Sequence, residues 1–223
     1  MDYTIENRPV FTTLKVQLAA GETLKAEAGA MVSMSSTIEL KSKTTGKGLG
    51  GMFKAAIGGE GLFSSEFTAV SPGEVVVAPP VPGDIIDLKI SGQTIFCQGG
   101  AYLAGSTGLE LSTQGSLKGL VSGEGLFLQK ISGAGDVFLS CYGAVTLKEL
   151  GAGETYIVDT GHMVAFEESV SYTIRKAAKG LMSTVLSGEG LTCEFSGPGK
   201  VWIQSRNIKG FASLIAKLIP NKS

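Results

Sequence analysis

Residues that could perform chemistry are few in this chain, and the single histidine limits them most. His162 is the one candidate for an imidazole ligand or general base among 223 residues. A metal-binding cupin, the commonest catalytic use of small β-barrels, needs several histidines plus a carboxylate. A Ser-His-Asp triad would have to use His162, and no G-x-S-x-G elbow is present. We therefore expect a local structural role for His162, with no catalytic residue, no bound metal and no cofactor.

The cysteines point the same way. Cys97, Cys141 and Cys193 are odd in number, and the sequence has no C-x-x-C pair. This argues against both a disulfide framework and a zinc site. Each cysteine stands among apolar or β-type neighbours, so we expect three small core residues. Trp202 and Tyr102 are likewise expected in a core or an interface.

The string Gly-Glu-Gly-Leu occurs three times, starting at residues 59, 123 and 188. A phosphate-binding loop would precede a helix and carry Lys-Ser/Thr or a third glycine. Here each copy precedes β-like sequence, and its glutamate would repel phosphate, so we expect a structural turn. The glutamates leave two interpretations open: capping of local N–H groups, or a cation site built around a symmetry axis. The residues concerned are Gly59, Gly61, Gly123, Gly125, Gly188 and Gly190 for the turns, and Glu60, Glu124 and Glu189 for the carboxylates.

These starts are 64 and 65 residues apart, and a second set of marks has the same order. Gly21, Gly92 and Gly153 each precede a β-like run, at 23–28, 94–98 and 155–159. Further strands are predicted at 31–34, 102–104 and 163–166, then at 36–40, 108–111 and 169–173, and after the next turns at 75–78, 137–140 and 201–204. Two independent marks that each recur three times in the same order indicate an internal triplication.

We therefore predict a mainly β fold (β-rich α+β) in one domain spanning residues 1–206. Three repeats of about 65 residues, at about 10–72, 73–135 and 136–206, would contribute antiparallel strands and short helices. The sheets would pack as a sandwich around a pseudo-threefold axis. Residues 207–223 are predicted to form a C-terminal amphipathic helix that ends at Pro220.

Four stretches have helical periodicity: 41–57, 114–121, 174–186 and 207–223. The third is the clearest, with apolar residues from Ile174 to Leu186 at i, i+3, i+4, i+7, i+8, i+11 and i+12. Together the four stretches hold 11 of the 19 basic residues and none of the 20 acidic ones. Basic amphipathic helices favour anionic membrane surfaces or acidic partners. The candidate contacts are Lys41, Lys43, Lys47, Lys54, Lys118, Arg175, Lys176, Lys179, Lys209 and Lys217; the alternative is that they are ordinary solvated residues.

Composition excludes several classes of protein. Glycine is high, at 32 residues, but no G-X-Y period runs through the chain and 43% of residues are hydrophobic, which excludes collagen and disfavours disorder. The net charge is −1, which makes nucleic acid an unlikely partner. No apolar run reaches the length of a membrane span. The first six residues lack the features of a secretory signal or a mitochondrial leader, so we expect a cytoplasmic protein.

Four motifs together resemble the family named for altered inheritance of mitochondria, protein twenty-four. They are Gly29-Ala30-Met31-Val32, Gly48-Leu49-Gly50-Gly51, Gly59 to Phe63, and the run from Pro79 to Ile85. The resemblance covers roughly residues 3 to 208. It implies a β-rich fold shaped like the trp RNA-binding attenuation protein, oligomeric prokaryotic members, and a mitochondrial branch linked to inner-membrane organisation. The family has no established catalytic residues, so none is carried over.

We expect a non-enzymatic scaffold or interaction protein, a homo-oligomer that docks on an anionic membrane surface or an acidic partner. A metal- or small-ligand-dependent enzyme using the symmetric glutamates is the alternative. RNA binding is a third hypothesis, although fold does not imply function.

Overall fold

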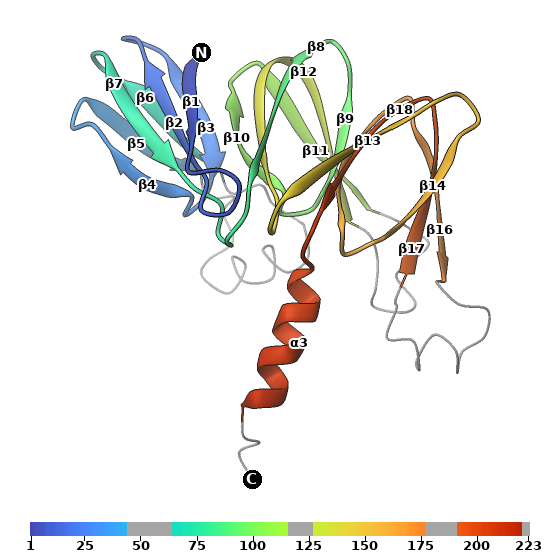
Figure 1. Cartoon of the computed structure of the whole chain (residues 1–223). Coiled ribbons are helices and arrows are strands. Elements are labelled where there is room, and N and C mark those ends of the chain that lie inside the picture. Colours follow the sequence, from blue (N-terminus) through green and yellow to red (C-terminus); the bar gives the residue numbers. More distant parts are fainter. Residues whose placement is uncertain (44–63, 116–126, 177–190, 220–223) are drawn as a thin grey trace.

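The computed structural model describes residues 1–43, 64–115, 127–176 and 191–219. These residues form eighteen strands and one helix, and Figure 1 shows the strands gathered into three units that lie side by side in chain order. The fold is mainly β, antiparallel and a single domain, as the sequence predicted.

The strands of each unit follow one another along the chain. The first unit contains β1 (Asp2–Glu6), β2 (Thr13–Leu18), β3 (Thr23–Glu27), β4 (Met31–Met34), β5 (Ile38–Lys43), β6 (Ser64–Ala69) and β7 (Gly73–Val77). The second contains β8 (Ile85–Ser91), β9 (Ile95–Gln98), β10 (Tyr102–Ser106), β11 (Leu109–Gly115) and β12 (Phe127–Ser140). The third contains β13 (Val145–Leu150), β14 (Thr155–Asp159), β15 (Met163–Glu167), β16 (Ser171–Lys176), β17 (Leu191–Ser196) and β18 (Gly199–Gln204), and is followed by α3 (Ile208–Leu218).

The same four antiparallel pairings occur in every unit. In the first unit β7 pairs with β2 and β4, and β6 pairs with β3 and β5. In the third unit β18 pairs with β13 and β15, and β17 pairs with β14 and β16. In the second unit the long strand β12 makes all four pairings, with β8, β10, β9 and β11. By pairing, the units therefore run from 13 to 77, from 85 to 140 and from 145 to 204.

Three apolar cores lie along the row of units, and the first two are completed by residues of the following unit. The first core combines residues such as Leu14 and Phe67 with Leu103 and Phe138 of the second unit. The second core combines Ile95 and Ile131 with Val164, Ala165 and Trp202 of the third unit. The third core, around Phe166 and Phe195, takes Leu128 from the second unit but is completed by no later unit. Tyr102 and Trp202 are thus core residues, as expected.

Glycine is required at the turns that precede β3, β9 and β14. Gly21, Gly92 and Gly153 have φ of +82°, +93° and +78°, in the left-handed region that L side chains rarely adopt. No atom would obstruct a Cβ at these positions, so the backbone conformation is the reason for glycine.

The predicted helical stretches need a correction. Residues 41–43, 114–115 and 174–176 are the ends of β5, β11 and β16, and the rest of those three stretches lies outside the described residues. Ile174, the first residue of the clearest helical pattern, packs on the third core from β16, opposite Cys193 of β17. One partly buried apolar residue fits either periodicity, and the ladder to β17 decides for strand. The helix predicted within 207–223 is present as α3.

Candidate functional site

The helix α3 is the most exposed apolar element among the described residues. None of its residues is buried, and Figure 1 shows it extending from β18 away from the strands. At 3.6 residues per turn, its apolar side chains cover more than half of the circumference, while Lys209, Ser213 and Lys217 share the remaining face. The exposed apolar residues are Ile208, Phe211, Leu214, Ile215 and Leu218, with Ile219 directly after the helix.

The start of α3 is well defined by its capping residue. The side chain of Asn207 accepts hydrogen bonds from the backbone N–H groups of Lys209, at 2.9 Å, and Gly210, at 3.3 Å. Gly161 lies so close to the Asn207 side chain that a Cβ at position 161 would collide with it. Phe211 also contacts the body: the centroid of its ring lies 6.1 Å from that of Tyr142, in an edge-to-face arrangement.

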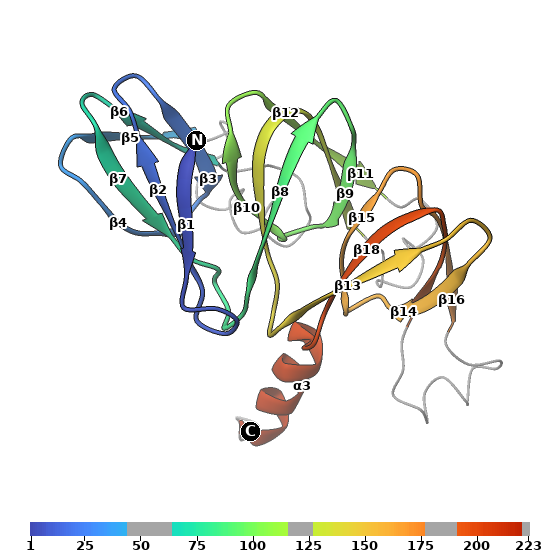
Figure 2. The same ribbon diagram turned by 45° about the horizontal axis from the view of Figure 1, so that its top comes forward.

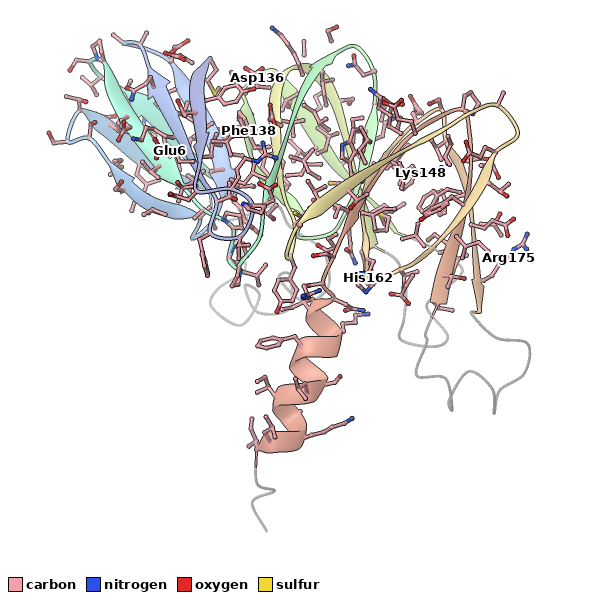
Figure 3. The ribbon with its side chains drawn as sticks, in the orientation of Figure 1. Glu6, Asp136, Phe138, Lys148, His162 and Arg175 are labelled. Carbon is pink, nitrogen blue, oxygen red and sulfur yellow. The ribbon has the colours of Figure 1, made fainter. Side chains whose placement is uncertain are left out.

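His162 lies beside the start of the helix (Figure 3), and its hydrogen bonds with Gln204 anchor the chain there. His162 Nδ1 donates to the backbone carbonyl of Gln204 at 2.8 Å, and the N–H of Gln204 donates to the His162 carbonyl at 2.8 Å. The Gln204 amide donates to the Gly161 carbonyl at 2.9 Å and accepts from the N–H of Tyr142 at 2.8 Å. The role of the one histidine is therefore to fix the end of β18, from which α3 begins.

The basic residues predicted to meet an anionic surface do not form one group. Lys209 and Lys217 lie on α3, with Lys217 in the last turn, where a cation favours the helix dipole. Lys41 is exposed on β5 but stands opposite Glu66 in the ladder, and Arg175 on β16 forms an ion pair with Glu194 at 3.0 Å. The remaining predicted contacts are Lys43 and Lys176, which end β5 and β16, and Lys47, Lys54, Lys118 and Lys179, which lie outside the described residues.

Two of the basic residues on the strands, Lys41 and Arg175, thus lie opposite or paired with an acidic residue of a neighbouring strand, and the helix differs from them. Arg206 precedes α3, and the sequence from 206 to 223 contains no aspartate or glutamate. This segment therefore contains no carboxylate side chain that could neutralise its basic residues, whereas Arg175 forms an ion pair with Glu194 of β17. The sequence has basic residues without acidic ones in four stretches. Among the described parts of these stretches, α3 is the one whose basic residues are not set opposite or paired with a carboxylate of a neighbouring strand.

The candidate cation site of the sequence is the set of three glutamates in the Gly-Glu-Gly-Leu strings. Glu60, Glu124 and Glu189, with the turn glycines Gly59, Gly61, Gly123, Gly125, Gly188 and Gly190, all lie outside the described residues. Within the described ranges, no three residues of the types His, Cys, Asp and Glu are placed to hold a metal ion. An open depression of about 520 Å³ beside β2 contains Glu22 and Glu74, but both carboxylates already accept hydrogen bonds, from the Ala19 N–H and the Gln17 amide.

The three cysteines are free thiols in the cores, as expected. Burial raises the pKa of Cys97 to about 12 and those of Cys141 and Cys193 to about 11. Because the thiolate is the nucleophile and the metal ligand, these cysteines are unreactive at neutral pH.

Sequence reasoning missed a second exposed apolar feature, on two edge strands. Met31, Val32 and Met34 of β4 and Tyr156 and Ile157 of β14 are exposed. Their positions in the repeat were visible in the sequence, but which copies of a repeated strand lack a neighbour depends on how the units are joined.

No helix in the described part of the chain has the length and apolar character needed to cross a bilayer.

Comparisons with known proteins agree with this architecture. A protein of Streptococcus pyogenes with a solved crystal structure has a similar fold, with a TM-score of 0.82 and 26% identity, over 98% of this chain and 99% of that one. An uncharacterised protein of Streptococcus pyogenes serotype M6 is 30% identical over the whole chain and 93% of its own length. The family model described as mitochondrial biogenesis AIM24 matches residues 3–206, nearly all of the β body and none of α3. The chain therefore belongs to the mitochondrial biogenesis AIM24 family.

Proposed function

We propose that the protein is a non-enzymatic scaffold that docks on an anionic membrane surface through α3. The observation that carries the proposal is the helix itself: every residue from Ile208 to Leu218 is exposed, and Phe211 contacts the described body at Tyr142. A helix of this kind gains free energy when its apolar face is removed from water.

The length of α3 favours docking in the plane of the membrane. Eleven residues at a rise of 1.5 Å extend about 16 Å, roughly half of the hydrocarbon core. The helix can therefore lie at the headgroup boundary with its apolar arc inward and the polar face toward water. Asn207 presets the first turn, which reduces the ordering that binding would otherwise require.

Charge identifies the kind of membrane. Lys209 and Lys217 flank the apolar arc, and Arg206 stands at its base. Basic residues at a membrane surface containing anionic lipids contribute about 1 kcal/mol each. An acidic protein partner would use the same charges, and a cytoplasmic location peripheral to the membrane is part of the same proposal.

Sedimentation with lipid vesicles tests the proposal. The purified chain should bind phosphatidylcholine vesicles containing phosphatidylserine and should bind pure phosphatidylcholine vesicles weakly. The double variant Lys209→Gln/Lys217→Gln should lose about 30-fold in affinity for the anionic vesicles, from about 1 kcal/mol per lysine.

A matched control variant changes the net charge by the same amount but leaves α3 intact. The variant Lys89→Gln/Lys200→Gln removes two lysines from β8 and β18 and should bind as the wild type does. Equal loss in both double variants would mean that overall charge, not α3, drives binding. Failure of the wild type to bind either vesicle would contradict the proposal.

A further inference from the structure

Neighbouring units of the chain are joined by one strand pairing that occurs twice. At the first junction β10 pairs with β3, in the register Ala104↔Ala26, Gly105↔Lys25 and Ser106↔Leu24. At the second junction β15 pairs with β9, in the register Ala165↔Cys97, Phe166↔Phe96 and Glu167↔Ile95. In each case the third strand-equivalent of the later unit joins the second strand-equivalent of the earlier unit, antiparallel.

The two junctions are equivalent residue by residue. Gly29, Gly100 and Gly161 mark the same place in the three units, and counting from them puts Ala104 level with Ala165, and Ala26 level with Cys97. The same counting puts Ser33 of β4 level with Ala104, and Val158 of β14 level with Cys97. The strand β4 is thus the joining strand of the first unit, and β14 is the receiving strand of the third unit.

Neither of these two strands is used for a junction. Within the described residues β4 pairs only with β7, and β14 only with β17. Figures 1 and 2 place the two strands at opposite ends of the row of units. One chain therefore has one free joining strand at its first unit and one free receiving strand at its last.

Equivalent side chains differ in exposure between the two internal junctions and the two free strands. The joining strands β10, β15 and β4 have the same one-residue bulge, and the residue within it is 0% exposed for Leu103, 1% for Val164 and 57% for Val32. On the receiving side, Ile95 is 4% exposed, whereas Tyr156 at the equivalent position is 42% exposed. Val32 and Tyr156 at the two ends are therefore exposed apolar or aromatic side chains, although the equivalent side chains at the internal junctions are buried.

The composition of the edges supports the same conclusion. Exposed sheet edges are usually protected by charged side chains, which discourage pairing with another chain. Each of the other edge strands in the described structure (β1, β5, β8, β11, β13 and β16) contains charged residues. The strand β4 has none, and β14 has only Asp159, at its end.

We propose that β4 of one copy of this chain pairs with β14 of a second copy, repeating the junction made twice within each chain. The pairing is antiparallel, with Ser33 opposite Val158, Met34 opposite Ile157, and Ser35 opposite Tyr156. Val32 enters the third core of the second copy, as Leu103 and Val164 enter the first and second cores. The contact is head to tail, so each copy uses both ends and assembly continues until a ring closes or a filament forms. This proposal is independent of docking through α3.

Cysteine cross-linking between copies tests the register and the direction. The variants Met34→Cys and Ile157→Cys each place a thiol on an exposed edge, and the native cysteines are buried. Paired positions on antiparallel strands lie within disulfide range. A mixture of the two variants should form a covalent dimer under mild oxidation, and each variant alone should not. Dimers formed by Met34→Cys alone, or no dimer in the mixture, would overturn the proposal.

Light scattering after gel filtration tests the assembly itself. The wild type should have a multiple of the 23.0 kDa chain mass, and Ile157→Lys should reduce it to shorter assemblies or the single chain. Leu147→Lys is the matched control, because Leu147 is also an exposed apolar residue on an edge strand, β13, that the proposed contact does not use. Its mass should equal that of the wild type. A wild type of 23.0 kDa, or equal dissociation of both variants, would refute the proposal; far-UV circular dichroism verifies that each variant is folded.

Discussion

The apolar contribution of α3 can be predicted quantitatively with the double variant Leu214→Ala/Leu218→Ala. Alanine keeps high helix propensity, so the helix should persist while its apolar surface shrinks. Both leucines are exposed in the free protein, 56% for Leu214 and 72% for Leu218, which leaves most of each side chain to be buried on docking.

The expected magnitude follows from these exposures. Truncation of leucine to alanine removes three carbons, worth about 2.4 kcal/mol when fully buried, at about 0.8 kcal/mol per methylene. Scaled by the exposed fraction, the loss is about 1.3 kcal/mol at Leu214 and about 1.7 kcal/mol at Leu218. At 1.4 kcal/mol per factor of ten, affinity for anionic vesicles should fall on the order of 100-fold.

Vesicle titration gives the dissociation constants directly. Leu147→Ala is the control, since Leu147 is 46% exposed but lies on β13 of the body. It should leave vesicle affinity within about twofold of the wild type, well below 1 kcal/mol. A change of less than threefold in the α3 variant would refute the docking of this apolar face.

Two further predictions concern stability. Asp84 is buried and its carboxylate accepts hydrogen bonds from the Arg8 guanidinium (2.9 Å), the Thr12 hydroxyl (3.2 Å) and the Ile85 N–H (2.8 Å), so Asp84→Ala should lower the free energy of unfolding in urea by about 3–5 kcal/mol. The half-exposed Asp87, which also lies near Arg8, should cost less than about 1 kcal/mol when changed to alanine, and similar losses at both sites would contradict this account. Burial raises the pKa of Glu27 from its ordinary value of 4.5 to about 7, so the folded state resists ionisation and the free energy of unfolding should fall as pH rises through this window. Glu27→Gln should then match the wild type in urea unfolding at pH 4 and exceed it by about 3 kcal/mol at pH 8; a constant difference at both pH values would count against the raised pKa.

Local sequence predicted the strands well where period and turn agree. The run 155–159 coincides with β14, and 31–34 coincides with β4, because a glycine turn precedes each run and β-type residues fill it. The helix after residue 207 was equally predictable, since Asn207 is a capping residue followed by an amphipathic run.

Local sequence failed where one apolar residue satisfied two periods. At 174–176 the helical pattern counted Ile174 as the start of an apolar stripe, whereas the ladder with Leu191 to Ser196 holds it in a strand. Backbone hydrogen bonds to partners 15 to 19 residues further along the chain outweigh local propensity, and a periodicity argument cannot include them.

The basic surface could likewise be predicted only in part from the sequence. The sequence shows that basic residues avoid acidic ones in certain stretches, but it does not show that Arg175 meets Glu194 or that Lys41 stands opposite Glu66. Those pairings depend on strand register, which long-range packing sets. The role of His162 could be predicted only as local, since its carbonyl partner, Gln204, is 42 residues away.

By itself the sequence determined the mainly β architecture, the absence of a histidine cluster, and an amphipathic basic segment at its end. These depend on residue type and spacing, which are properties of a linear sequence. Only the tertiary structure decided that the apolar face of α3 stays exposed, and that, in the described part of the chain, the joining strand β4 and the receiving strand β14 are not paired with another unit. The physical reason is that exposure and pairing depend on which units lie beside each other, and equivalent strands differ in whether another unit lies next to them.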